Sequence, residues 1–201
     1  MKIGILSDIH ADLAALQSAL SLFEDHDVDL TVCCGDLVDR GADGDAVVDL
    51  IKSRQVPCIA GNHDRQAPLY QKWITENNID ARDPNISARL LTENTLQFLR
   101  DLPDDLRFEW EGLRVLMVHG TPNRIDEYLF PHSPSARFKQ IAMDAKADII
   151  LSGHTHTPMA VKQRAVYFYN PGSVHRNASR GSNTCAILTL PERKFDVLNL
   201  S

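Results

Sequence analysis

The chain has 201 residues, of which 43% are hydrophobic and 24% are charged, a balance that is ordinary for a globular protein. A net charge of −6 without any basic run disfavours binding to a nucleic-acid backbone on electrostatic grounds. The sequence shows neither a signal peptide nor an apolar run of membrane-spanning length, so we expect one cytoplasmic domain over residues 1–201 with no membrane partner.

The first sixty residues alternate between strand and helix patterns. Short apolar runs predict three strands, over residues 2–6, 30–34 and 56–60. Apolar side chains at helical spacing predict a helix over residues 11–25, with Asp12 as its cap, and a second helix over residues 45–54. This rhythm is typical of a parallel α/β layer.

The remainder of the chain follows a different pattern. Residues 66–110 are polar and irregular, apart from a predicted helix within residues 91–103 that Thr92 would cap and Pro103 would follow. Further strands are expected over residues 113–118, 147–152, 165–169, 184–190 and 194–200, the last two joined by a turn at residues 191–193. One α/β domain with two packed sheets fits this pattern best.

The four cysteines lie in or beside apolar runs, at Cys33, Cys34, Cys58 and Cys185. None belongs to a Cys-X-X-Cys pair, so the sequence predicts reduced and buried thiols.

Polar side chains that can bind a metal follow five of the predicted strands. They are Asp8, His10, Asp36, Asn62, His63, His119, His154 and His156. Ligands bind at the carboxyl ends of strands in open α/β sheets, so we expect these side chains to converge. Oxygen and imidazole donors without a thiolate suit Mn, Fe, Zn or Ni, and the set is larger than one tetrahedral ion needs. We therefore expect two divalent metal ions.

Each short motif also has a simpler explanation. The Asp-Ile-His at residues 8–10 could form an Asx turn or a helix cap, and His119 could be an ordinary turn residue. The Gly-His-Thr-His at residues 153–156 could lie in a solvated loop, and the acids within residues 35–41 could be turn formers paired with Arg40. Independent turns, however, have no reason to place so many metal-binding residues at strand ends.

Five motifs occur in the order DIH, GDLVDRG, GNHD, VHG and GHTH, and together they resemble the calcineurin-like metallophosphoesterase superfamily over residues 1–173. The pieces HGTPNRIDEYLF and NPGSV are similar to those of small bacterial and archaeal phosphodiesterase-like members. The resemblance implies an α/β fold, a four-layer β-sandwich of two mixed sheets flanked by helices. GDLVDRG is also close to the matching block of Ser/Thr protein phosphatases and of symmetrical dinucleoside-tetraphosphate hydrolases.

The resemblance also implies how the ligands divide. One ion would be held by Asp8, His10, Asp36 and His156, and the other by Asp36, Asn62, His119 and His154, with Asp36 bridging. A hydroxide between the ions would then attack phosphorus and hydrolyse a small phosphodiester or nucleotide. Many relatives have Gly-Asn where this chain has Ala11 and Asp12, which adds a negative charge near the expected phosphate entrance.

Three residues are expected to act on the substrate. His63 follows the ligand Asn62 without being assigned to a metal, so it is the candidate general acid. By resemblance to the protein phosphatases, Asp39 would hydrogen-bond His63 and keep it protonated. Arg40 would bind phosphate oxygens, although a surface ion pair with Asp39 or Asp43 is an alternative.

Substrate preference is expected to depend on residues 66–110 and 121–130, which would form the rim of the site. Arg124 and Tyr128 could contact a phosphate or a base, or could serve packing or a contact between subunits of a homo-oligomer. Other functions remain open: a protein or phosphomonoester phosphatase, a symmetrical dinucleoside-polyphosphate hydrolase, a nuclease, or a silent scaffold such as the retromer subunit of this superfamily. Residues 170–174 could approach the cluster, whereas His175 and Arg176 receive no role from the sequence.

Overall fold

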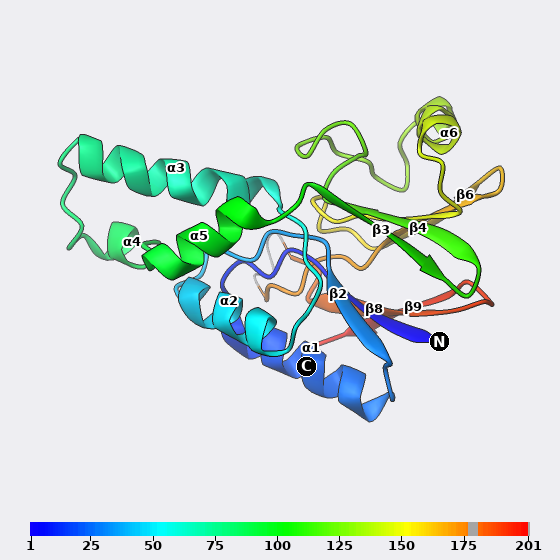
Figure 1. Cartoon of the computed structure of the whole chain (residues 1–201), viewed down its shortest axis with the longest axis horizontal. Coiled ribbons are helices and arrows are strands. Elements are labelled where there is room, and N and C mark those ends of the chain that lie inside the picture. The colour runs from blue at the N-terminus through cyan, green and yellow to red at the C-terminus, as the bar shows by residue number, and fades with distance from the viewer. Residues whose placement is uncertain (177–180, 201) are drawn as a thin grey trace.

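The computed structural model describes residues 1–176 and 181–200, and two mixed β-sheets form its centre (Figure 1). The first sheet has the order β2-β1-β8-β9, formed by β1 (Lys2–Leu6), β2 (Leu30–Cys33), β8 (Thr184–Thr189) and β9 (Lys194–Asn199). The second has the order β3-β4-β5-β7-β6, formed by β3 (Asp105–Trp110), β4 (Leu113–Val118), β5 (Ile149–Leu151), β6 (Met159–Gln163) and β7 (Val166–Asn170). Each sheet contains both parallel and antiparallel neighbours.

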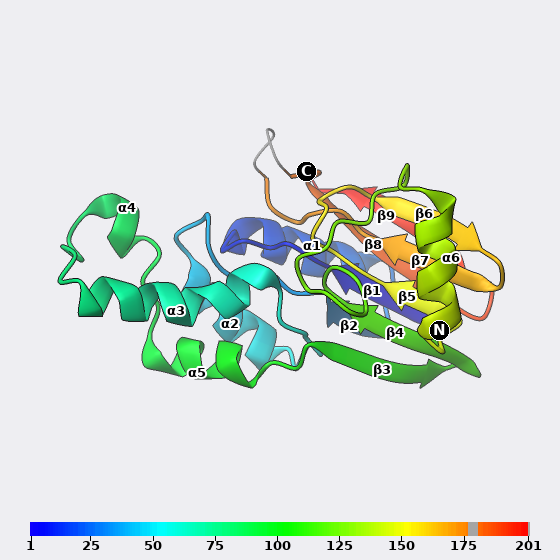
Figure 2. The same ribbon diagram turned by 90° about the horizontal axis from the view of Figure 1, so that it is seen from above.

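Helices cover the outer faces of the sheets and extend beyond one end of them (Figure 2). On the first sheet lie α1 (Leu13–Asp25) and α2 (Gly44–Ser53), and on the second lies α6 (Ser135–Asp144). Residues 62–101 contain α3 (Asn62–Glu76), α4 (Pro84–Ser87) and α5 (Glu93–Asp101), and we call this segment the helical arm.

The alternation of side chains along β1 shows how the layers are held together. Ile3 and Ile5 lie in the core between the two sheets, whereas Leu6 packs with side chains of α1 and α2. In the second sheet, Leu116 and Phe168 pack on the other side, against α6. The order helix, sheet, sheet, helix confirms the α/β sandwich that the sequence predicts.

Two predicted caps are present in the structure. Asp12 Oδ1 accepts a hydrogen bond from the backbone N–H of Ala15 at 3.0 Å, and Thr92 Oγ1 accepts one from Thr95 at 3.4 Å. The four cysteines are buried and unpaired, as expected. No helix within the described residues is both long enough and apolar enough to cross a membrane.

Several predicted elements are wrong. Residues 56–60 form only an isolated bridge between Cys33 and Cys58 in place of a strand, and Pro57 cannot donate to a ladder. The segment predicted as irregular contains α3 and β3. Because α3 buries only Asp64 and Ile74, its sequence lacks the apolar stripe that marks a helix. The sequence also does not reveal α6 or β6.

Candidate active site

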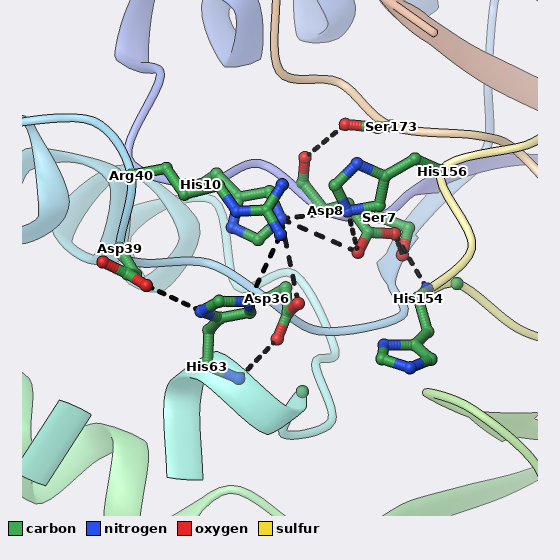
Figure 3. Close-up of polar contacts among 12 residues, drawn as sticks. Ser7, Asp8, His10, Asp36, Asp39, Arg40, His63, His154, His156 and Ser173 are labelled. Carbon is green, nitrogen blue, oxygen red and sulfur yellow. Dashed lines mark hydrogen bonds and ion pairs between the residues drawn. The ribbon is translucent and has the colours of Figure 1, made fainter. Parts of the chain in front are cut away.

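Polar residues from both sheets meet at one edge of the sandwich (Figure 3). Asp8 and His10 follow β1, Asp36 follows β2, Asn62 and His63 begin α3, His119 follows β4, and His154 and His156 follow β5. The parallel pairs β1-β2 and β4-β5 place these carboxyl ends at the same edge. Four of these residues are at most 1% exposed: Asp8, His10, Asp36 and His119.

Asp8, His10 and His156 form the first group of possible metal ligands. Nε2 of His156 lies 3.1 Å from Oδ1 of Asp8 and 3.1 Å from Nε2 of His10. Nδ1 of His10 lies 3.3 Å from the carbonyl oxygen of Val38, to which it can only donate. This tautomer leaves Nε2 of His10 with a lone pair directed at the group.

Asp36, His119 and His154 form the second group, and a third, His10, Asp36 and His63, overlaps both. Nδ1 of His119 donates to the Cys34 carbonyl at 2.7 Å, so its Nε2 faces Asp36 Oδ2 at 3.3 Å and Asn62 Oδ1 at 3.1 Å. Nε2 of His154 donates to the carbonyl of Asp126 at 3.1 Å, which leaves Nδ1 as its free lone pair.

Asp36 belongs to the second group and also approaches the first. Its Oδ2 is 3.8 Å from His10 Nε2 in the first group and 3.3 Å from His119 Nε2 in the second. Burial opposes its charge, but the imidazoles of His119 and His10 outweigh burial and hold the pKa of the carboxyl below its usual range.

The donor set fits divalent cations. Asp8 Oδ1 is buried, and apart from the 3.1 Å contact with His156, itself a candidate ligand, it has no polar partner of hydrogen-bond geometry among the described residues, so this oxygen is suited to a cation. Burial alone would lower the pKa of His119, yet the charges of Asp36 and Asp8 raise it to about 10. The same negative potential would stabilise a metal ion, and the oxygens and imidazoles are ligands that such ions accept.

The backbone around these residues adopts an unusual conformation. The φ angles are 54° at Asp8, 50° at His10, 58° at Asp36, 64° at His154 and 55° at His156. Non-glycine residues seldom occupy this left-handed region, and single residues such as Gln55 and Lys146 also do so in turns of this chain away from the site, but five among the candidate ligands is a concentration typical of functional sites. A side chain at Gly61 would clash with the Asp36 carboxylate, so glycine allows the close approach of these two loops.

Asp64 has a supporting role that the sequence analysis missed. Its buried carboxylate accepts hydrogen bonds from the backbone N–H groups of Asp36 at 2.8 Å, Leu37 at 2.8 Å and Gly61 at 2.9 Å. Burial and the nearby charge of Asp36 raise the pKa of Asp64 to about 7. The carboxylate therefore holds the loop that carries Asp36; its place in GNHD was the available signal.

Ser7 and Ser173 hold the loop that carries Asp8. The hydroxyl of Ser7 donates to Asp8 Oδ2 at 2.6 Å, and that of Ser173 donates to the Asp8 carbonyl at 2.9 Å (Figure 3). The expected approach of residues 170–174 to the cluster is thus seen in the structure.

His63 and Asp39 lie beside the two groups as a hydrogen-bonded pair. Nδ1 of His63 donates to Asp39 Oδ2 at 2.7 Å, and the rings of His63 and His10 are 5.0 Å apart. Burial lowers the pKa of His63, but the Asp39 hydrogen bond and the charges of Asp36 and Asp39 raise it overall. Asp39 thus engages Nδ1 of His63, while Nε2 lies on the other side of the ring, next to the side chain of Arg40.

Arg40 is exposed, and its Nη2 lies 3.4 Å from Nε2 of His63. Among the described residues, neither Asp39 nor Asp43 forms a side-chain ion pair with it, which leaves the guanidinium available to an anion. The partner of Asp39 is instead Arg89 from the helical arm, a contact that the sequence does not reveal.

Asp12 is engaged in local structure. One carboxylate oxygen caps α1 through Ala15, and the other accepts the backbone N–H of Arg176 at 3.1 Å. Nδ1 of His175 lies 3.5 Å from the same oxygen, and its ring is 5.9 Å from that of His10. Asp12 therefore holds His175 and Arg176 beside the site.

The segment after β4 forms another side of the site. The ring of Tyr128 stacks on that of His154, with centroids 4.1 Å apart, and Phe130 stacks on Tyr128 at 5.7 Å. Arg124 is exposed and pairs with Asp126 at 3.3 Å. Because the ring of Tyr128 already stacks on Phe130 and on His154, its position favours covering His154 over stacking on a nucleotide base.

Comparison with known proteins agrees with this geometry. A sequence profile for the calcineurin-like phosphoesterase superfamily domain matches residues 1–193. A phosphodiesterase of Methanocaldococcus jannaschii is 25% identical over 174 residues, which cover 86% of this chain and 83% of that protein. The crystal structure of a metallophosphoesterase from Sphaerobacter thermophilus has a TM-score of 0.75 and 25% identity, covering 100% of this chain and 89% of that one. A hypothetical protein from Pyrococcus horikoshii shares the fold at a TM-score of 0.83 and 18% identity, covering 100% and 88% respectively.

Proposed function

The chain belongs to the calcineurin-like phosphoesterase superfamily, and we propose that it uses two divalent metal ions to hydrolyse a small phosphodiester or nucleotide. The observation that carries this proposal is that Asp36 belongs to one group of metal-binding side chains and also approaches another. The family implies hydrolysis of phosphoesters, and a relative named as a phosphodiesterase supports the choice of a diester.

The roles of the ligands follow from the two groups. Asp8, His10 and His156 would hold one ion, His119, His154 and Asn62 would hold the other, and Asp36 would contact both. Bound ions of this kind, whether Mn, Fe, Zn or Ni, supply an activated water and neutralise negative charge on the phosphoryl group.

The residues beside the ligands would assist departure of the alcohol. His63 would donate the proton on Nε2 to the leaving oxygen, while Asp39 fixes the ring through Nδ1. Arg40 would bind phosphate oxygens with its guanidinium. This role is supported by the absence of an ion pair between Arg40 and either Asp39 or Asp43 within the described residues.

A monoester or protein phosphatase is the second candidate, favoured by the Asp39–His63 pair within the phosphatase-like GDLVDRG and GNHD motifs. A scaffold without activity is disfavoured because the chain retains both ligand groups together with His63. A phosphopeptide assay against bis-para-nitrophenyl phosphate separates the first two functions.

Asp36→Asn tests the proposal directly. We expect this variant to lose metal bound to the purified protein and to lose most turnover of bis-para-nitrophenyl phosphate in added manganese. Asp43→Asn is the matched control, since it makes the same chemical change at an exposed residue of the same loop. Metal content and turnover that survive Asp36→Asn unchanged would refute the dinuclear site.

A further inference from the structure

The carboxylate of Asp39 makes two contacts, one with each oxygen. Oδ2 accepts the hydrogen bond from His63 Nδ1 at 2.7 Å. Oδ1 accepts one from Nε of Arg89 at 2.6 Å, and Nη2 of Arg89 pairs with the same oxygen. Arg89 therefore binds the oxygen that His63 does not use.

Arg89 comes from a distant part of the chain. It lies 50 residues beyond Asp39, in the helical arm between α4 and α5. Its guanidinium stands over the ring of Tyr70 on α3 at 5.5 Å, and that ring in turn stacks on Trp73. The arginine is thus held by the arm as well as by the carboxylate.

The segment that carries Arg89 is itself anchored to α3. The side-chain amide of Gln71 donates to the carbonyl of Leu91 at 2.9 Å, and its oxygen accepts the N–H of Leu91 at 2.9 Å. Arg89, Asp39, His63 and Tyr70 all line a cavity of about 130 Å³ between the arm and the GDLVDRG loop.

The physical effect concerns the orientation of a carboxylate. A carboxylate with one partner can rotate about its terminal torsion, which is soft, and can then exchange its oxygens or tilt. A charge-assisted hydrogen bond to the second oxygen removes this freedom. With Oδ1 held by Arg89, Oδ2 stays directed at Nδ1 of His63, and the imidazole plane stays fixed.

We propose that Arg89 is a positioning residue for His63, acting through Asp39, so that the helical arm is part of the machinery that protonates the leaving group. This inference rests on the proposed function. As the bond between phosphorus and the leaving oxygen breaks, the proton moves from His63 Nε2 to that oxygen. Arg89 touches neither atom and keeps the donor aligned.

The test compares Arg89→Ala and Arg89→Lys on two diesters, bis-para-nitrophenyl phosphate and an alkyl diester with a poor leaving group. Protonation matters mainly for the poor leaving group, so we expect Arg89→Ala to lower its kcat about 10-fold or more and the nitrophenyl kcat about 2-fold or less. Arg89→Lys, or low-millimolar guanidinium added to Arg89→Ala, should restore part of the loss. Arg82→Ala is the control, because Arg82 is an exposed arginine of the arm whose side chain pairs with Asp80 and not with Asp39.

Equal losses on both esters, or no rescue by lysine and guanidinium, would overturn the positioning role. A second measurement does not depend on turnover: the proton NMR signal of the His63 imidazole N–H should shift or broaden in Arg89→Ala and stay unchanged in Arg82→Ala. An unchanged signal in Arg89→Ala would also reject the inference. A wild-type protein inactive on every ester, with the NMR effect present, would reject the proposed function alone.

Discussion

Nε2 of His10 lies 3.1 Å from Nε2 of His156, although 146 residues separate them in the chain. Two imidazole nitrogens this close cannot both direct lone pairs at each other without a proton or a cation between them. Burial lowers the pKa of His10 to about 4, against the opposing charges of Asp36 and Asp8. The ring is therefore neutral near neutral pH, the state in which imidazole binds a metal.

Removal of the imidazole of His63 tests the general acid. We expect His63→Gln to lower kcat for alkyl diesters by about 100-fold or more, because general acids contribute factors of that size. Bis-para-nitrophenyl phosphate, whose leaving group needs no proton, should lose far less. Steady-state kinetics on both esters measures the difference, and similar losses on both would rule out the acid role.

Tyr128 should affect metal affinity. Its ring covers His154 while remaining 59% exposed, so truncation would leave this ligand free to reorient. We expect Tyr128→Ala to weaken manganese binding about 10-fold, a typical cost of losing a partner of a metal ligand, and Tyr128→Phe to change it little. Titration against a competing chelator measures this, with His132→Ala as control. If Tyr128→Ala binds manganese as tightly as the wild type, Tyr128 has no role in holding His154 and serves only in surface packing.

Asp64 should be important for stability. Both oxygens of Asp64 now accept hydrogen bonds from backbone N–H groups. In Asp64→Asn an NH₂ donor replaces one of these oxygens, so at least one backbone N–H group loses its acceptor. We expect Asp64→Asn to lower the free energy of unfolding by about 2 kcal/mol, since a buried unsatisfied donor costs about that much. Urea denaturation measures it. The exposed control Asp49→Asn on α2 should match the wild type, and equal stability of Asp64→Asn would contradict the role.

The Arg114–Asp148 pair should make a small contribution that depends on pH. Hydrogen bonds from the side chain and backbone of Arg114 lower the pKa of Asp148 from 3.8 to about 2. Because this pKa is lower in the folded protein than in the unfolded chain, the ionised carboxylate stabilises the fold at any pH above the unfolded-state pKa. The stabilisation is lost as the pH falls through about 2, the folded-state pKa. Because the pair is partly exposed, we expect Asp148→Asn to cost at most about 1 kcal/mol.

Urea denaturation at neutral pH and at about pH 2 would measure the difference between wild type and Asp148→Asn. The difference should be greatest at neutral pH and much smaller near pH 2. A difference that stays constant over this range would show that the charge of Asp148 contributes nothing.

Much of the fold could be predicted because buried strands are short and apolar, as with residues 2–6 and 113–118. The helical arm could not, since α3 is solvated along most of its length and Pro68 lies inside it. In such a helix the stabilising contacts are made by residues distant in sequence, such as Gln71 with Leu91, and no periodic pattern records them.

The candidate ligands could be found because strand ends at one sheet edge gather their side chains, whatever the strand order. The role of Arg89 could not be predicted, because Arg89 reaches Asp39 through a tertiary contact between the arm and a loop. Asp64 lies within the GNHD motif, but the motif does not show what Asp64 binds, because its partners are backbone N–H groups of another loop.

The left-handed backbone at Asp8, His10 and Asp36 limits how descendants of this protein can diverge. Valine, isoleucine or threonine at these positions would be disfavoured by backbone sterics before any effect on chemistry was felt, whereas glycine and asparagine would be comfortable there. Aspartate and histidine belong to the residue types that enter this region more readily than most, so the backbone and the metal chemistry favour overlapping choices at these three positions. The backbone therefore narrows the substitutions that can be tolerated there even in a protein that has lost its activity.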